Sequence, residues 1–143
     1  MSSLAGKTVI VTGVSKGIGA ATAQAVIKAG ARLIAHYGSD RDGVEKATSF
    51  ASEGQVTLLK ADFSDMDAVD AFWIHALKAA DGYIDVLVNN AGIMHQTGGI
   101  EDSIEDWEEA WSHSIAVNVK APARLLRHAV RSWLQAEKTG SII

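Results

Sequence analysis

The most informative segment of the sequence is TGVSKGIG, residues 12–19. It overlaps the end of an apolar, β-branched run, 8–12 (TVIVT), which is typical of a strand covered on both faces. Helical spacing of apolar residues then runs over 18–29, ahead of Gly30. Glycines in such a turn let the main chain approach a ligand, and the helix points its free N–H groups and positive dipole end at it. The position favours a bound pyrophosphate, whereas the alternative is a tight turn without a ligand.

After this turn, short apolar runs alternate with amphipathic segments along the rest of the chain. Strands that alternate with helices at this spacing pair in parallel through right-handed crossovers. We therefore expect one α/β domain over 1–143, a Rossmann-like doubly wound parallel sheet of order 3-2-1-4-5 with helices on both faces. The pattern predicts strands over 8–12, 32–37, 56–61 and 84–88, and helices over 18–29, 42–52, 64–80 and 103–137, the last beginning with a capping-box pair, Ser103 and Asp106.

The composition of the chain argues against several classes of function. The formal net charge of −4 offers no basic surface for a nucleic-acid backbone, and the five histidines show no metal-ligand spacing. No run approaches the ~18 apolar residues of a membrane span, and the first residues contain no signal-peptide core. The absence of cysteine fits a reducing compartment. We expect a cytoplasmic domain that binds neither nucleic acid, membrane nor metal.

A second motif of small residues, Asn89-Asn90-Ala91-Gly92 (NNAG), directly follows the fourth predicted strand. In a sheet of order 3-2-1-4-5, the carboxyl ends of strands one and four flank the place where ligands bind. Small residues at that place leave room for a ribose. By itself the motif would be explained as well by an ordinary Asn-Gly turn.

Together the two motifs carry a resemblance to a known family. TGVSKGIG is similar to the TGxxxGxG pattern of the short-chain dehydrogenases/reductases, and NNAG resembles that family's second signature at a matching distance. The resemblance runs from Lys7 to Ile143 and implies an NAD(P)-dependent oxidoreductase that moves a hydride between nicotinamide and a carbonyl or alcohol substrate. It also implies an adenine contact by Asp62. The cofactor-binding residues implied by the two motifs and by the end of the third strand are Gly13, Ser15, Lys16, Gly17, Ile18, Gly19, Asp62, Phe63, Asn89, Ala91 and Gly92.

The end of the second predicted strand bears on the choice of cofactor. NAD-preferring members of the resembled family place an acidic residue there, and the corresponding residue here is Tyr37. Ser39 and Arg41 follow, and Lys16 lies in the glycine turn. Two cations and a hydroxyl suit a 2′-phosphate, so we expect NADP(H) rather than NAD(H), bound in part by Tyr37, Ser39 and Arg41. The alternative is that Lys16 and Arg41 are ordinary solvated charges.

The segment 111–118 (WSHSIAVN) resembles the family's fourth helix, which ends on a catalytic asparagine, so Asn118 is the expected catalytic residue. Pro122 has no N–H to donate to the carbonyl of Asn118, which predicts a helix distortion between the two residues and a free acceptor. The resemblance implies that this carbonyl holds a water molecule of a proton relay. A bend that wraps the helix around the sheet is compatible with that role.

The family's other catalytic residues, a serine and a Tyr-x-x-x-Lys motif, follow its fifth strand. Here Tyr37 and Tyr83 are followed four residues later by Arg41 and Leu87 rather than by lysine, and 140–143 (GSII) resembles the entrance to that fifth strand. We expect a sheet truncated after the start of strand five and a chain that is inactive by itself. It would be the cofactor-binding half of an oxidoreductase or, alternatively, a non-catalytic dinucleotide-binding or assembly module.

Self-association is a further expectation. A bare apolar edge on the fifth strand invites pairing with another chain. In the resembled family the long helix, here around 117–134, packs against its twin in the usual dimer. We therefore expect a homo-oligomer, either a dimer or a tetramer.

Overall fold

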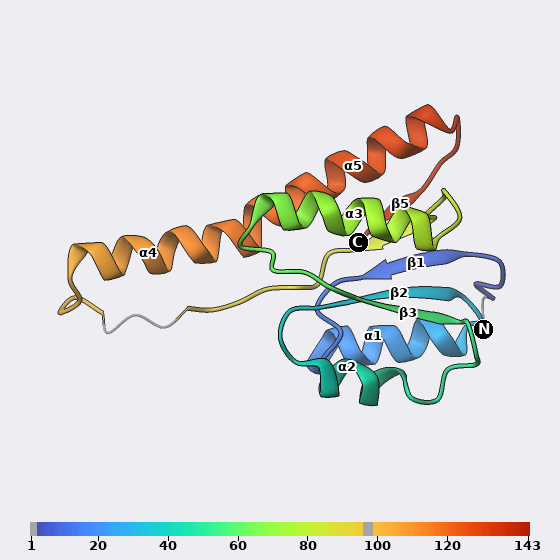
Figure 1. Cartoon of the computed structure of the whole chain (residues 1–143), viewed down its shortest axis with the longest axis horizontal. Coiled ribbons are helices and arrows are strands. Elements are labelled where there is room, and N and C mark those ends of the chain that lie inside the picture. Colours follow the sequence, from blue (N-terminus) through green and yellow to red (C-terminus); the bar gives the residue numbers. More distant parts are fainter. Residues whose placement is uncertain (1–2, 96–98) are drawn as a thin grey trace.

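The computed structural model describes residues 3–95 and 99–143 and is built around a five-stranded parallel sheet (Figure 1). The strands lie in the order β3-β2-β1-β4-β5, and each pairs in parallel with its neighbours. The predicted strand order and fold class are confirmed. The strand bounds are β1 (Thr8–Val11), β2 (Arg32–Tyr37), β3 (Val56–Lys60), β4 (Val86–Val88) and β5 (Ser141–Ile142).

Helices cover both faces of the sheet, as Figure 1 shows: α1 (Gly17–Lys28) and α2 (Arg41–Thr48) on one face, α3 (Met66–Ala79) and α5 (Ala121–Gln135) on the other. Successive strand residues point to opposite faces, so a sheet covered on both sides needs an apolar residue at nearly every position. In β1, Val9 and Val11 pack in the core under α1 and α2, whereas Ile10 packs in the core under α3 and α5. This arrangement explains the unbroken apolar run over 8–12.

The long helix predicted over 103–137 is two helices joined by a π-helical segment. The first, α4 (Ile104–Ile115), continues through η1 (Ala116–Lys120) into α5. In η1 the N–H of Ala121 donates to the carbonyl of Ala116, five residues back, instead of four. Pro122, which lacks an N–H, lies two residues after the end of this segment, so the predicted distortion near Asn118 is confirmed.

Side-chain caps move several boundaries away from those predicted. The N–H of Ser64 donates to the Asp62 carboxylate, and the Asp65 carboxylate caps α3, so α3 begins at Met66 rather than at Ser64. The Asp40 carboxylate accepts from the N–H of Gly43, so α2 begins at Arg41, one residue before the predicted start. At the start of α4, Ser103 accepts from the N–H of Asp106, as the capping-box pattern predicts.

Large apolar side chains remain exposed along the last two helices. They include Trp107 and Trp111 on α4, Val119 on η1 and Leu126 and Leu134 on α5. Within 3–95 and 99–143 no helix combines the length and the apolar character that crossing a membrane requires.

Candidate functional site

A pocket of about 830 Å³ opens where the carboxyl ends of β1, β2, β3 and β4 meet the start of α1. This edge of a parallel sheet is where α/β proteins bind their ligands. Most of the predicted cofactor-binding residues line the pocket, whereas Gly17, Tyr37, Arg41 and Asn89 do not. The predicted residues that line it are Gly13, Ser15, Lys16, Ile18, Gly19, Ser39, Asp62, Phe63, Ala91 and Gly92.

The glycine turn after β1 has the conformation and the close packing that only glycine allows. Gly13 and Gly17 have φ values of +70° and +58°, in the left-handed region that side chains disfavour. A Cβ atom on Gly19 would lie 2.0 Å from the carbonyl oxygen of Gly13, so no side chain fits there. Lys16, the N-cap of α1, makes no side-chain cap hydrogen bond. The positive end of α1 therefore faces the pocket without a capping carboxylate or hydroxyl of its own.

Asn90 ties the second motif to the first. Its side-chain amide donates to the carbonyl oxygens of Thr12 and Gly13, at 2.8 and 3.1 Å. In return, Thr12 Oγ1 accepts from the backbone N–H groups of Asn90 and Ala91, both at 2.9 Å. Neither Thr12 nor Asn90 is among the predicted site residues, although both stand inside the quoted motifs. Their role is to hold the two loops of the pocket at a fixed separation.

His36, near the end of β2, joins two walls of the pocket and is also absent from the predicted site. Its Nδ1 accepts from the N–H of Gly13 at 3.1 Å, and its Nε2 lies 3.0 Å from the carbonyl oxygen of Ala61. A carbonyl can only accept, so Nε2 carries the proton and the ring is neutral. Burial lowers the pKa of His36 from 6.5 to about 4. The sequence signal for His36 is a polar ring inside a mostly apolar strand, RLIAHY.

Asp62 contributes a negative charge to the pocket wall after β3. Its Oδ1 accepts from the N–H and the hydroxyl of Ser64, at 2.9 and 2.7 Å. These hydrogen bonds lower the pKa of Asp62 below its usual value. Phe63, the next residue, is buried and also lines the pocket.

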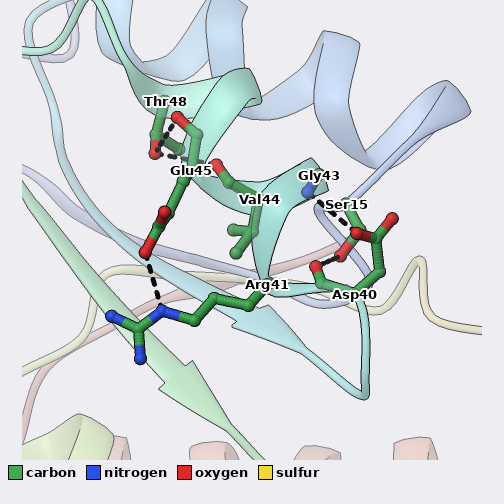
Figure 2. A network of polar contacts seen from close by, with 7 residues as sticks. All are labelled: Ser15, Asp40, Arg41, Gly43, Val44, Glu45 and Thr48. Carbon is green, nitrogen blue, oxygen red and sulfur yellow. Dashed lines mark hydrogen bonds and ion pairs between the residues drawn. The ribbon is translucent and has the colours of Figure 1, made fainter.

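The residues after β2 are arranged differently from the expectation for a 2′-phosphate. Tyr37 is 7% exposed and packs in the core under α1 and α2, away from the pocket lining. The guanidinium of Arg41 extends to Glu45, one helical turn along α2, where Nε donates to Oε1 at 2.7 Å (Figure 2). The hydrogen bond to Glu45 raises the pKa of Arg41. Ser39 alone of the three predicted residues lines the pocket.

Asp40 connects this loop to the glycine turn. The hydroxyl of Ser15 donates to the carbonyl of Asp40 at 2.7 Å, and the Asp40 carboxylate accepts from the N–H of Gly43 (Figure 2). The two lysines in the pocket lining are Lys16 and Lys60. Within the described residues neither lysine has an acidic partner within 4.0 Å.

Asn118 lies at the edge of the pocket, where its neighbours Val117 and Ile93 contribute to the lining. Its side chain holds Ile93, accepting from the N–H at 2.8 Å and donating to the carbonyl at 2.7 Å. Asn89 lies outside the lining, and its N–H donates to the carbonyl of Ile143 beside β5. In the described part of the chain, no group of three or more acidic or histidine residues could hold a metal ion.

Comparisons with known proteins point to one family. A family model described as short chain dehydrogenase matches residues 7–143. The chain is 36% identical over 142 residues to 3beta-hydroxysteroid dehydrogenase 1 of Eggerthella lenta, covering 98% of this chain and 52% of that protein. It is 31% identical to a 3-oxoacyl-[acyl-carrier-protein] reductase of Synechocystis, covering 100% of this chain and 56% of the relative. The chain thus spans about half the length of the curated relatives it matches.

Among solved structures, a metagenomic short-chain oxidoreductase crystallised in complex with NADP superposes with a TM-score of 0.80 at 34% identity. The match covers 99% of this chain and 61% of that one. This structural match shows a shared fold, and the family model over residues 7–143 shows the family.

Proposed function

Because this chain belongs to the short-chain dehydrogenase family, we propose that its pocket binds NADP(H) and that the chain forms the cofactor-binding half of an oxidoreductase. The observation that carries the proposal is the glycine turn under the uncapped start of α1. Free N–H groups and the positive end of the helix dipole together favour a pyrophosphate at this position. The wall formed by Asp62 and Phe63 would then contact the adenine.

The preference for NADP(H) over NAD(H) rests on Lys16 and Ser39. Both line the pocket, and Lys16 has no acidic partner within the described residues. A cation and a hydroxyl beside the adenosine ribose suit a 2′-phosphate. Arg41 contributes less than the sequence suggests, because its guanidinium is already paired with Glu45. The structural relative that was crystallised with NADP supports the same choice.

When bound, the nicotinamide would supply or accept the hydride in an exchange with a carbonyl or alcohol substrate. Asn118, on η1, would be part of the catalytic site. Its side chain hydrogen-bonds to the backbone of Ile93 at the edge of the pocket. The sequence contains no Tyr-x-x-x-Lys to move the substrate proton. We propose that these 143 residues alone bind the dinucleotide without turning over a substrate. A non-catalytic dinucleotide-binding or assembly module would share this property.

We also propose a cytoplasmic location and self-association through the exposed apolar side chains of α4 and α5, among them Trp111 and Leu134. The absence of cysteine supports the proposed cytoplasmic location, because it fits a reducing compartment.

Sedimentation velocity at increasing protein concentration tests the proposed self-association. A sedimentation coefficient that stays at the monomer value at high concentration would contradict it.

Binding is tested by isothermal titration with NADPH and NADH. We expect tighter binding of NADPH, and Lys16→Ala should weaken it about tenfold while changing the affinity for NADH less. Lys46→Ala, which removes an exposed cation on α2, is the matched control. Equal affinities of the unmodified chain for both cofactors would refute the NADP preference, and no binding of either would refute the proposed function. Steady oxidation of NADPH with any carbonyl compound would refute the inactivity.

A further inference from the structure

His36 occupies a place from which one side chain reaches two other strands. It lies on β2, between β1 and β3, one residue before that strand ends. In the strand register His36 is opposite Leu59, while its neighbour Ala35 is opposite Val11. His36 therefore lies near the ends of both adjacent strands, where the chain turns toward the pocket.

The two groups that the ring bonds lie beyond the ends of those strands. The N–H of Gly13 follows β1 and the carbonyl of Ala61 follows β3, so both have left the β-ladder. Polar backbone groups beside a core need partners, because leaving them unpaired costs free energy. His36 supplies one partner to each group. Its own carbonyl also accepts from the N–H of Val14 at 2.9 Å, which is a second link to the glycine turn.

Few side chains could make both bonds. A neutral imidazole carries one acceptor and one donor on opposite sides of a rigid ring. The ring is also fixed in orientation, because it stacks on Phe63 at 3.8 Å with an interplanar angle of 5° and meets Phe72 edge to face at 5.2 Å. Only 3% of His36 is exposed, so water does not compete for either bond.

We infer that His36 is a positioning residue for dinucleotide binding: its ring sets the glycine turn at Gly13 and the wall at Ala61 and Phe63 at the separation that the ligand requires. This inference rests on the proposed dinucleotide function. Asn90 fixes the same turn to the β4 loop, so Gly13 is held from both sides. Without His36, the link to β3 would be lost while the link to β4 remained.

The test compares His36→Gln, which keeps an amide acceptor and donor, with His36→Phe, which keeps an aromatic ring and loses both hydrogen bonds. The exposed His75→Phe on α3 is the matched control. NADPH affinity is measured by titration at a temperature where circular dichroism shows each variant folded, and the melting temperature is recorded separately. We expect about tenfold weaker binding for His36→Phe and a smaller loss for His36→Gln.

A purely structural role would lower the melting temperature of His36→Phe without changing the affinity of the folded protein, and that result would overturn the inference. If neither variant folds, the ¹⁵N spectrum of the unmodified chain decides. The inference requires a protonated Nε2, an unprotonated Nδ1, and shifts of both the ring and the Gly13 amide on adding NADPH. Unmoved signals under saturating NADPH would overturn it. Failure of the unmodified chain to bind any dinucleotide would instead refute the proposed function itself.

Discussion

The carboxamide of Asn118 forms two hydrogen bonds with the backbone of Ile93, accepting from its N–H at 2.8 Å and donating to its carbonyl at 2.7 Å. The π-helical segment and the loop after NNAG are thereby joined at the edge of the pocket. The side chain of the expected catalytic residue thus has a structural partner, although its role in catalysis stays a prediction.

Replacing Asn118 with alanine should release this loop. Both bonds lie at an exposed position, so we expect a loss of about 1 kcal/mol in the free energy of unfolding. Hydrogen exchange followed by NMR should show faster exchange of the Ile93 amide. Lys120→Ala, an exposed change in the same π-helical segment, is the control and should leave that rate unaltered. Equal protection of the Ile93 amide from exchange in both variants would contradict the hydrogen bonds between Asn118 and Ile93.

Alanine at position 19 should disrupt the glycine turn. The added Cβ would meet the Gly13 carbonyl oxygen at 2.0 Å and the side-chain nitrogen of Asn90 at 2.5 Å, so helix α1 must shift. We expect a destabilisation of about 2–3 kcal/mol, measured by urea unfolding. Gly38→Ala is the contrast, because nothing lies within 4 Å of its Cβ position and its φ is not in the left-handed range. Similar losses for the two variants would be inconsistent with the packing described.

Stability should fall as the pH drops from 6.5 to about 4, the interval between the ordinary pKa of histidine and the lowered pKa of buried His36. In that window the unfolded chain binds a proton that the folded chain excludes, so acid favours unfolding, by about 3 kcal/mol in total. Urea unfolding at a series of pH values measures the slope. The His36→Gln variant should show a shallower slope, and an unchanged slope would mean that other groups carry the effect.

Asp70 on α3 binds Arg124 and His128 on α5, with Arg124 Nε at 2.6 Å and His128 Nε2 at 2.7 Å from Oδ1. These partners hold the pKa of Asp70 well below its usual value, so the stabilisation is present above the usual pKa of 3.8 and is lost as the pH falls below it.

A double-mutant cycle of Asp70→Asn and Arg124→Gln should give a coupling energy of about 1 kcal/mol, because the partly exposed pair is screened by water. The Arg32–Asp81 pair, in which Asp81 is 82% exposed, should couple more weakly. Arg124 donates to both carboxylate oxygens of Asp70, from Nε to Oδ1 and from Nη2 to Oδ2. A coupling at Asp70 no larger than that of the control pair would show that this bidentate geometry adds nothing.

Local features of the sequence determined the sheet order, the two loops of the pocket and the distortion of the long helix. Unbroken apolar runs require a sheet covered on both faces, and Pro122 removes a helical donor in any tertiary context. The sequence pattern predicts the start of α2 one residue too late. It therefore leaves Arg41 outside the helix, although the spacing of Arg41 and Glu45 allows their pairing on one helical face.

The roles of His36 and Tyr37 follow from contacts between distant parts of the chain. Both stand at the end of the same strand and differ in the face toward which they point. The His36 ring hydrogen-bonds to two backbone groups beyond the ends of the neighbouring strands, and the Tyr37 ring is buried under α1 and α2. The two hydrogen-bond partners of His36, Gly13 and Ala61, lie 23 and 25 positions away from it in the sequence. No local sequence pattern can therefore predict them. The sequence motifs predict where the pocket forms, and the packing of β1, β2 and β3 sets which side chains hold its walls together.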